Sequence, residues 1–159
     1  MTTGSLRAWI LASCLAALPL LAPAADTPDV KPADDKLAGV RGHIQAKRWD
    51  AALDELKRVN DTGSADWNNL MGYSLRKQRV PDLDAAERFY LEALRLDPRH
   101  RNALEYLGEL YLMKGDLPSA EKRLATLDRL CTFGCEQYTD LKKAVERYKA
   151  SGNKYGAAP

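Results

Sequence analysis

Two cysteines near the C-terminal end of the chain are the residues best suited to chemistry. Cys131 and Cys135 lie four positions apart in the segment Cys-Thr-Phe-Gly-Cys. Such a pair can form a disulfide, act as a redox-active dithiol, or supply two thiolates to a metal ion. Two thiolates make only half of a structural zinc shell, whereas Cu(I) can use two soft ligands. The choice depends on the compartment and on the helices around the pair.

The other residues show no pattern that is typical of catalysis. The chain has two histidines. His100 falls in the polar linker Asp-Pro-Arg-His-Arg-Asn, and His43 falls in a helical segment where a packing role is expected. The sequence contains no nucleophile elbow, glycine-rich phosphate loop or His-Glu-x-x-His motif. We therefore expect that the protein is not an enzyme and uses neither a cofactor nor a small-molecule substrate.

Residues 1–24 have the pattern of a secretory signal peptide. Arg7 precedes an apolar run that ends in Ala-Pro-Ala, and these small residues suit cleavage after Ala24. Residues 25–35 follow as a polar, flexible leader. Cleavage predicts a periplasmic or secreted protein. Two alternatives stay open: a retained membrane anchor, and a lipoprotein attached to the membrane through Cys14.

Removal of the signal peptide changes the charge and the cysteine count of the mature chain. It leaves 23 basic and 22 acidic residues, because Arg7 is removed. A net charge near +1 gives no electrostatic footprint for nucleic acid or an anionic membrane. Cys131 and Cys135 become the only cysteines in an oxidising compartment, and an even number there favours a disulfide.

A repeat of 34 residues organises the rest of the chain. Ala52, Ala86 and Ala120 follow one another at this step, and apolar residues recur around them at i, i+3, i+4 and i+7. That spacing predicts one buried helical face in each copy. A second helical stretch precedes the last two copies, with Gly72 or Gly108 in its middle. A glycine costs about 1 kcal/mol inside a helix, so we expect Gly72 to pack closely on Ala86, and Gly108 on Ala120.

These copies carry the motif residues of a known repeat. In residues 103–127 they are Leu107, Gly108, Tyr111, Gly115, Asp116 and Ala120. In residues 68–98 they are Gly72, Ala86, Tyr90, Ala93, Asp97 and Pro98, with an inner turn two residues longer than usual. Over about residues 36–131 the chain therefore resembles the tetratricopeptide repeat family.

The resemblance implies an all-α fold. Its expected form is a short right-handed superhelix of about three antiparallel helix pairs, closed by a polar cap helix. The repeats are expected at about residues 36–60, 66–98 and 101–131, the cap helix at 135–150, and a disordered tail at 151–159.

The resemblance also implies a concave groove, lined by the first helix of each pair, that binds a protein or peptide partner. The groove-facing residues, matched one by one to the family pattern, are Asn69, Tyr73, Arg76, Asn102, Glu105 and Glu109. The set is mixed in charge. Glu105 and Glu109 are expected to repel the C-terminal carboxylates that some members of the family bind.

The repeat also places the two cysteines. One period after Asp97 lies Cys131, which should therefore end the last repeat helix, while Gly134 takes a left-handed turn and Cys135 begins the cap. Cysteines that flank a bend can reach disulfide geometry, so we predict a bond that fastens the cap. The function we expect is that of a protein-interaction scaffold; the alternative is a thiol- or copper-handling protein that uses this pair.

Overall fold

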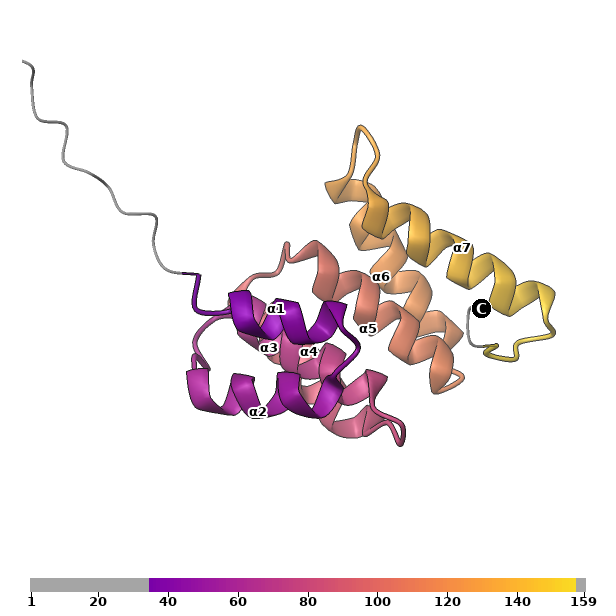
Figure 1. Ribbon diagram of the computed structural model, residues 1–159. Coiled ribbons are helices and arrows are strands. Elements are labelled where there is room, and N and C mark those ends of the chain that lie inside the picture. Colours follow the sequence, from indigo (N-terminus) through magenta and orange to yellow (C-terminus); the bar gives the residue numbers. More distant parts are fainter. Residues whose placement is uncertain (1–34, 157–159) are drawn as a thin grey trace, which may run out of the picture. The chain divides into compact units, whose positions relative to one another are not determined.

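The computed structural model describes residues 35–156, which form an all-α fold (Figure 1). This part of the chain contains seven helices: α1 (Ala38–Gln45), α2 (Trp49–Val59), α3 (Ala65–Lys77), α4 (Leu83–Leu96), α5 (Arg101–Met113), α6 (Leu117–Leu130) and α7 (Glu136–Ala150). No helix in the described part is long and apolar enough to cross a membrane. The predicted signal peptide, its cleavage site, Cys14 and all of the leader but its last residue lie outside the described residues.

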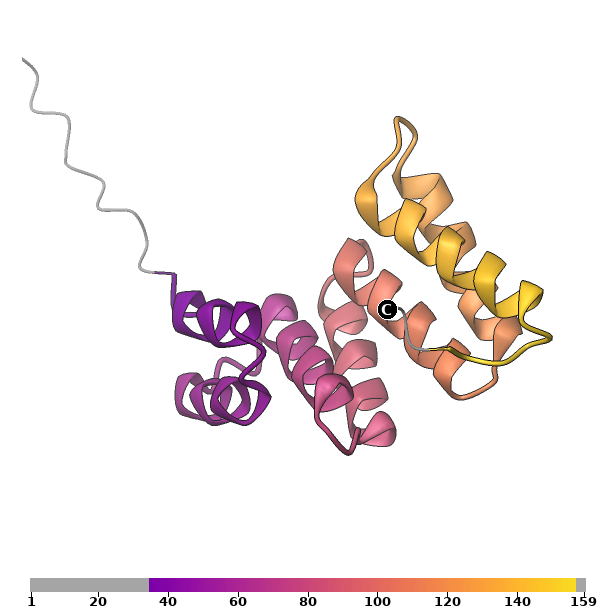
Figure 2. The same cartoon turned by 45° about the vertical axis from the view of Figure 1, so that its right-hand side comes forward.

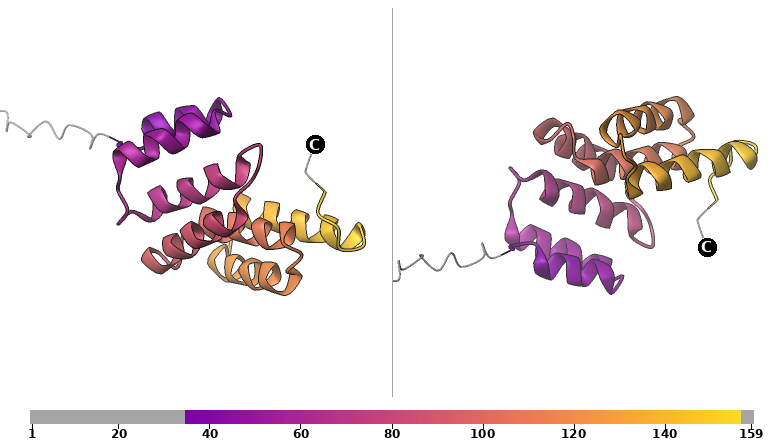
Figure 3. Two further views of the ribbon diagram at one scale, coloured as in Figure 1. Left: turned by 90° about the horizontal axis from the view of Figure 1, so that it is seen from below. Right: turned by 90° about the horizontal axis from the view of Figure 1, so that it is seen from above.

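Consecutive helices pack as pairs, as the sequence predicts. α1 packs on α2, α3 on α4 and α5 on α6, and each pair contacts the next through α2 with α3 and α4 with α5 (Figure 2). The second helices begin at Trp49, Leu83 and Leu117, which are 34 residues apart. α7 packs on both α5 and α6 (Figure 3). The cap therefore contacts two helices of the last pair.

Side-chain caps define where several helices begin. The side chains of Ser64, Asp82 and Asp116 accept hydrogen bonds from backbone amides in the first turns of α3, α4 and α6. His100 does the same for α5, because its Nδ1 accepts from Ala103 N at 3.1 Å. Its Nε2 lies 3.0 Å from Asp66 Oδ1 on α3. His100 is therefore a half-buried helix cap that joins α5 to α3, and not merely the polar linker residue that the sequence predicts.

The repeated small residues lie in the core, as predicted. Ala52, Ala86 and Ala120 are all fully buried. A Cβ built on Gly72 would lie 2.8 Å from Tyr90 Cε1 and 3.0 Å from the carbonyl oxygen of Ala86, so close packing against α4 explains this glycine.

Gly108 differs from the expectation. The atoms nearest to a Cβ built on it belong to Leu141, whose Cδ2 would lie 2.5 Å away. The close neighbour of this glycine is therefore the cap helix α7, and not Ala120 on α6.

A disulfide joins the end of α6 to the start of α7. Cys131 caps the C-terminus of α6, Cys135 caps the N-terminus of α7, and their Cα atoms lie 5.6 Å apart. Between them Gly134 has a φ of 84°, and its amide donates to the carbonyl oxygen of Cys131. The predicted pairing and the predicted left-handed turn are both confirmed.

Replacing Cys135 by serine is expected to destabilise the oxidised protein by about 2 kcal/mol, the chain-entropy value for so short a loop. The loss should appear at the cap, because the bond fastens α7 to the helix pair that it covers. Thermal unfolding followed by circular dichroism, with and without reductant, measures the effect. Reductant should lower the midpoint of the wild type to that of Cys135→Ser and leave the variant unchanged; equal midpoints without reductant would contradict the prediction.

Candidate functional site

Helices α3 and α5 bring most of the predicted groove residues together. Tyr73 and Arg76 lie on α3, Asn102, Glu105 and Glu109 lie on α5, and the two helices are in contact. All five line one cavity of about 390 Å³. Five further residues complete its wall, and these are Lys77, Tyr106, Glu136, Gln137 and Asp140.

Asn69, the sixth predicted residue, is placed elsewhere. It is only 2% exposed and does not line the cavity. Its Oδ1 is buried without a hydrogen-bond partner in the described part of the chain. Asn69 is therefore an interior residue of α3 and does not face the groove.

An ion pair between a buried guanidinium and a half-buried carboxylate lies in the wall of the cavity. Nη1 of Arg76 lies 2.6 Å from Oε2 of Glu109, and the side chain of Arg76 is only 2% exposed. Its Nε and Nη2 are buried and have no hydrogen-bond partner among the described residues. Burial disfavours the charge, but the neighbouring Tyr90 and Glu109 hold the pKa of Arg76 above its usual value. The site thus contains a charged guanidinium whose Nε and Nη2 donors form no hydrogen bond within the described residues.

Aromatic rings lie beside this guanidinium. The ring centroids of Tyr73 and Tyr106 lie 5.6 and 5.5 Å from Cζ of Arg76, and 4.7 Å from each other. Trp49 on α2 contacts Tyr73 edge to face, with the ring centroids 5.9 Å apart. These rings offer flat apolar surface next to cations, a combination that suits apolar and aromatic side chains of a ligand.

The acidic side of the cavity carries less negative charge than its residues suggest. Burial, with Glu109 and Asp140 nearby, raises the pKa of Glu105 to about 8, so this carboxyl is mostly protonated at neutral pH. Glu109 is neutralised by Arg76. Glu105 and Glu109 therefore repel a carboxylate less than the sequence predicts, although Glu136 and Asp140 also line this cavity.

The cap helix forms the opposite wall, which sequence reasoning did not anticipate. Nε2 of Gln137 on α7 donates to Oδ1 of Asn102 on α5 at 2.8 Å. Tyr106 also lines the cavity, although it is not among the groove residues predicted from the sequence. It follows Tyr73 by 33 residues, and Glu109 follows its partner Arg76 by the same number. That shared step is the signal that could have found it.

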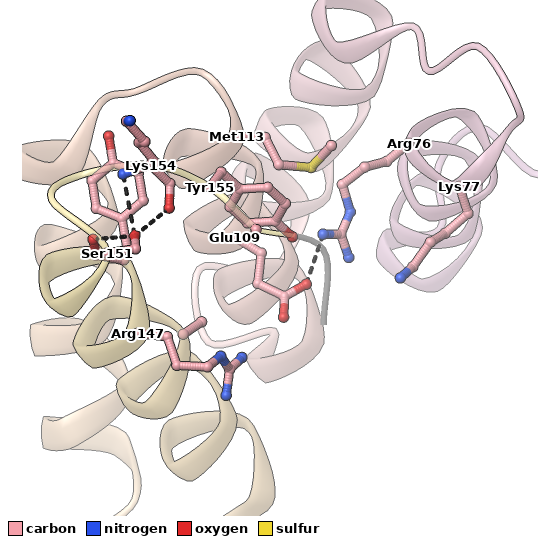
Figure 4. Close-up of a pocket in the computed structure, with 11 residues that line it drawn as sticks. Arg76, Lys77, Glu109, Met113, Arg147, Ser151, Lys154 and Tyr155 are labelled. Atoms are coloured by element: carbon pink, nitrogen blue, oxygen red, sulfur yellow. Dashed lines mark hydrogen bonds and ion pairs between the residues drawn. The ribbon is translucent and has the colours of Figure 1, made fainter. Parts of the chain in front are cut away.

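A second cavity of about 380 Å³ extends the groove toward the C-terminal end of α7. It shares Arg76, Lys77 and Glu109 with the first cavity, and Figure 4 shows these side chains together with Met113 and Arg147. The remaining residues of its lining come from the end of α7 and from residues 151–156. The two cavities are therefore neighbours along α3, α5 and α7, and together they are called the groove here.

No protein-family model matches the chain, and no curated protein matches it either. Within residues 35–156, no group of three or more His, Cys, Asp or Glu side chains could hold a metal ion. The sulfur atoms of Cys131 and Cys135 are bonded to each other. What the groove offers is non-covalent: aromatic faces, a buried guanidinium and hydrogen-bonding side chains.

Proposed function

We propose that the protein is a non-catalytic interaction module of the tetratricopeptide type, which binds a peptide or helix of a partner protein in the groove between α3, α5 and α7. One observation carries the proposal: five of the six predicted groove residues line a single cavity, and three side chains of its lining also line a neighbouring one. The resemblance of the repeats to that family supports the same assignment.

The chemistry of the groove suits a chain segment. Tyr73 and Tyr106 provide faces for apolar side chains, and such aromatic anchors often dominate peptide affinity. Nε and Nη2 of Arg76 can each donate to a peptide carbonyl or carboxylate oxygen once a ligand reaches them. Asn102 and Gln137, already bonded to each other, add amide groups that a peptide backbone can use.

We infer further that the protein acts outside the cytoplasm, in the periplasm or after secretion. The signal-peptide pattern and cleavage after Ala24 carry this inference. The disulfide between Cys131 and Cys135 supports it, because such bonds persist in oxidising compartments.

Cross-linked affinity capture from the protein's own cell envelope tests the function. The groove variants are Tyr73→Ala, which removes an aromatic face, and Lys77→Glu, which reverses an exposed charge on the rim. Leu91→Ala, at a 42% exposed position of α4 outside both cavities, is the control. We expect recovery of the specific partner to fall at least about fivefold for each groove variant and to stay unchanged for the control.

The same samples check the proposed location and the fold of the variants. The intact mass of the recovered protein should begin at Ala25, whereas an acylated Cys14 would give a lipoprotein mass. Circular dichroism confirms that the variants are folded. Equal recovery of every captured protein by wild type, Tyr73→Ala and Lys77→Glu would refute binding in the groove.

A further inference from the structure

The chain turns back after α7 and runs along the groove. Residues 151–156, named here the C-terminal strap, are described by the structure, although the sequence predicts a disordered tail from 151 onward. Gly152 and Asn153 have φ values of 72° and 61°. Their amides donate to the carbonyl oxygens of Lys149 and Tyr148. This left-handed turn reverses the chain direction and carries Tyr155 toward α3 and α5.

The C-terminal strap closes one end of the groove. Lys154, Tyr155 and Gly156 line the second cavity, opposite Arg76, Lys77 and Glu109. Figure 4 shows the ring of Tyr155 beside Glu109, with its hydroxyl directed toward the guanidinium of Arg76. Tyr155 is 39% exposed, so its ring lies against the groove with one side open to solvent. Burial raises the pKa of the Tyr155 hydroxyl, and the negative charge of the nearby Glu109 raises it further.

The strap is attached to the groove by side-chain packing alone. Its hydrogen bonds within the described residues go to the last turn of α7 or stay inside the strap, such as that between Ser151 and Lys154. None of these bonds reaches α3 or α5. Such a segment is held less firmly than the helices that it covers.

The charged side chains that line the second cavity are mostly cationic. Lys154 lies in a cavity that Lys77 and Arg147 also line, while the only carboxylate in this lining, that of Glu109, is paired with Arg76. The lining therefore carries a net positive charge. With the strap in place, Nε and Nη2 of Arg76 have no hydrogen-bond partner among the described residues. A ligand that supplies an oxygen acceptor there would satisfy donors that the strap leaves unsatisfied.

We propose that the C-terminal strap is a built-in competitor: Tyr155 occupies one end of the partner-binding groove, and a partner segment enters by displacing it. This inference rests on the proposed function and adds its regulation. A closed strap lowers the apparent affinity for the partner by the fraction of molecules in which the groove is open. Removing the ring of Tyr155 should therefore strengthen partner binding.

The rate at which peroxide oxidises Met113, monitored by peptide mass spectrometry, measures how far Tyr155 covers the cavity when no partner is present. Met113 lines the same cavity as Tyr155, while Met71, which is 7% exposed in the other core cluster, is an internal reference. Tyr155→Ala should speed the oxidation of Met113 at least about threefold and leave Met71 unchanged. Phe133→Ala removes a fully exposed ring outside the groove and should change neither rate.

Partner capture with the same variants measures the competition. Tyr155→Ala should raise recovery at least about threefold, and Phe133→Ala should not. An unchanged rate of Met113 oxidation in Tyr155→Ala would overturn the claim that Tyr155 covers one end of the groove. Faster Met113 oxidation with unchanged partner recovery would overturn the claim that Tyr155 competes with the partner. In that case, loss of partner recovery in Tyr73→Ala and Lys77→Glu would still uphold the proposed function. If those two groove variants recover the partner normally, the proposed function fails and the competition fails with it.

Discussion

Replacing Glu109 by alanine is expected to lower the free energy of unfolding by about 3 kcal/mol. Arg76 is 2% exposed at its side chain, and Glu109 is the one carboxylate with which it forms an ion pair in the described part of the chain. Without Glu109 the guanidinium stays charged and buried with no counter-charge, which is the costly state of a broken buried pair. Urea unfolding at neutral pH, followed by circular dichroism, measures the loss.

A double variant separates the charge from the packing. Arg76→Met combined with Glu109→Leu removes both charges and keeps most of the volume, so its stability should return close to that of the wild type. Glu109→Gln keeps an acceptor at the same place and should fall between Glu109→Ala and the wild type. A loss below about 1 kcal/mol for Glu109→Ala would mean that water screens the pair as it does a surface salt bridge.

Replacing Tyr90 by alanine is expected to cost about 4 kcal/mol, the usual range for a fully buried aromatic side chain. Tyr90 is completely buried in the core cluster that contains Ala86 and Leu107, and its ring centroid lies 6.2 Å from that of Tyr106 beneath the groove. Tyr155→Ala is a matched control, because Tyr155 is 39% exposed and should cost less than about 1 kcal/mol. The same urea titration gives both values.

Gly72 supplies a second check on this packing. A Cβ at position 72 would press on the Tyr90 ring at 2.8 Å and on the carbonyl oxygen of Ala86 at 3.0 Å, so Gly72→Ala alone should destabilise the protein. In the Tyr90→Ala background the ring is gone, and the added methyl fills part of the cavity. The double variant should then be more stable than Tyr90→Ala. Simple addition of the two losses would contradict this coupling.

Several features were predictable from the sequence because they are local or periodic. The helical spacing around Ala52, Ala86 and Ala120 reports which face of a helix is buried, and those alanines are buried. The step of 34 residues reappears in the starting positions of α2, α4 and α6. The disulfide followed from two cysteines on either side of a glycine turn. The assignment to the tetratricopeptide family, export and partner binding remain predictions.

Three residues have surroundings that differ from the prediction, because those surroundings depend on which helices pack against each other. Periodicity predicts that Gly108 needs a close neighbour, but only the docking of α7 makes that neighbour Leu141. Asn69 has the helical phase of a groove residue, yet it lies in the interior. His100 reads as a polar linker residue, and its role as a cap appears only because α5 begins beside Asp66 of α3.

The sequence by itself determined the helices, their pairing in the chain, the disulfide between Cys131 and Cys135, and five of the ten residues that line the first cavity. These follow from a spacing of 3.6 residues per turn and from backbone preferences, which act between near neighbours. Only the tertiary structure decided that Arg76 pairs with Glu109, that α7 forms a wall of the groove, and that Tyr155 covers one end of it. These contacts join residues far apart in the chain, so they depend on the packing of whole helices and on a short turn that has no periodic signal.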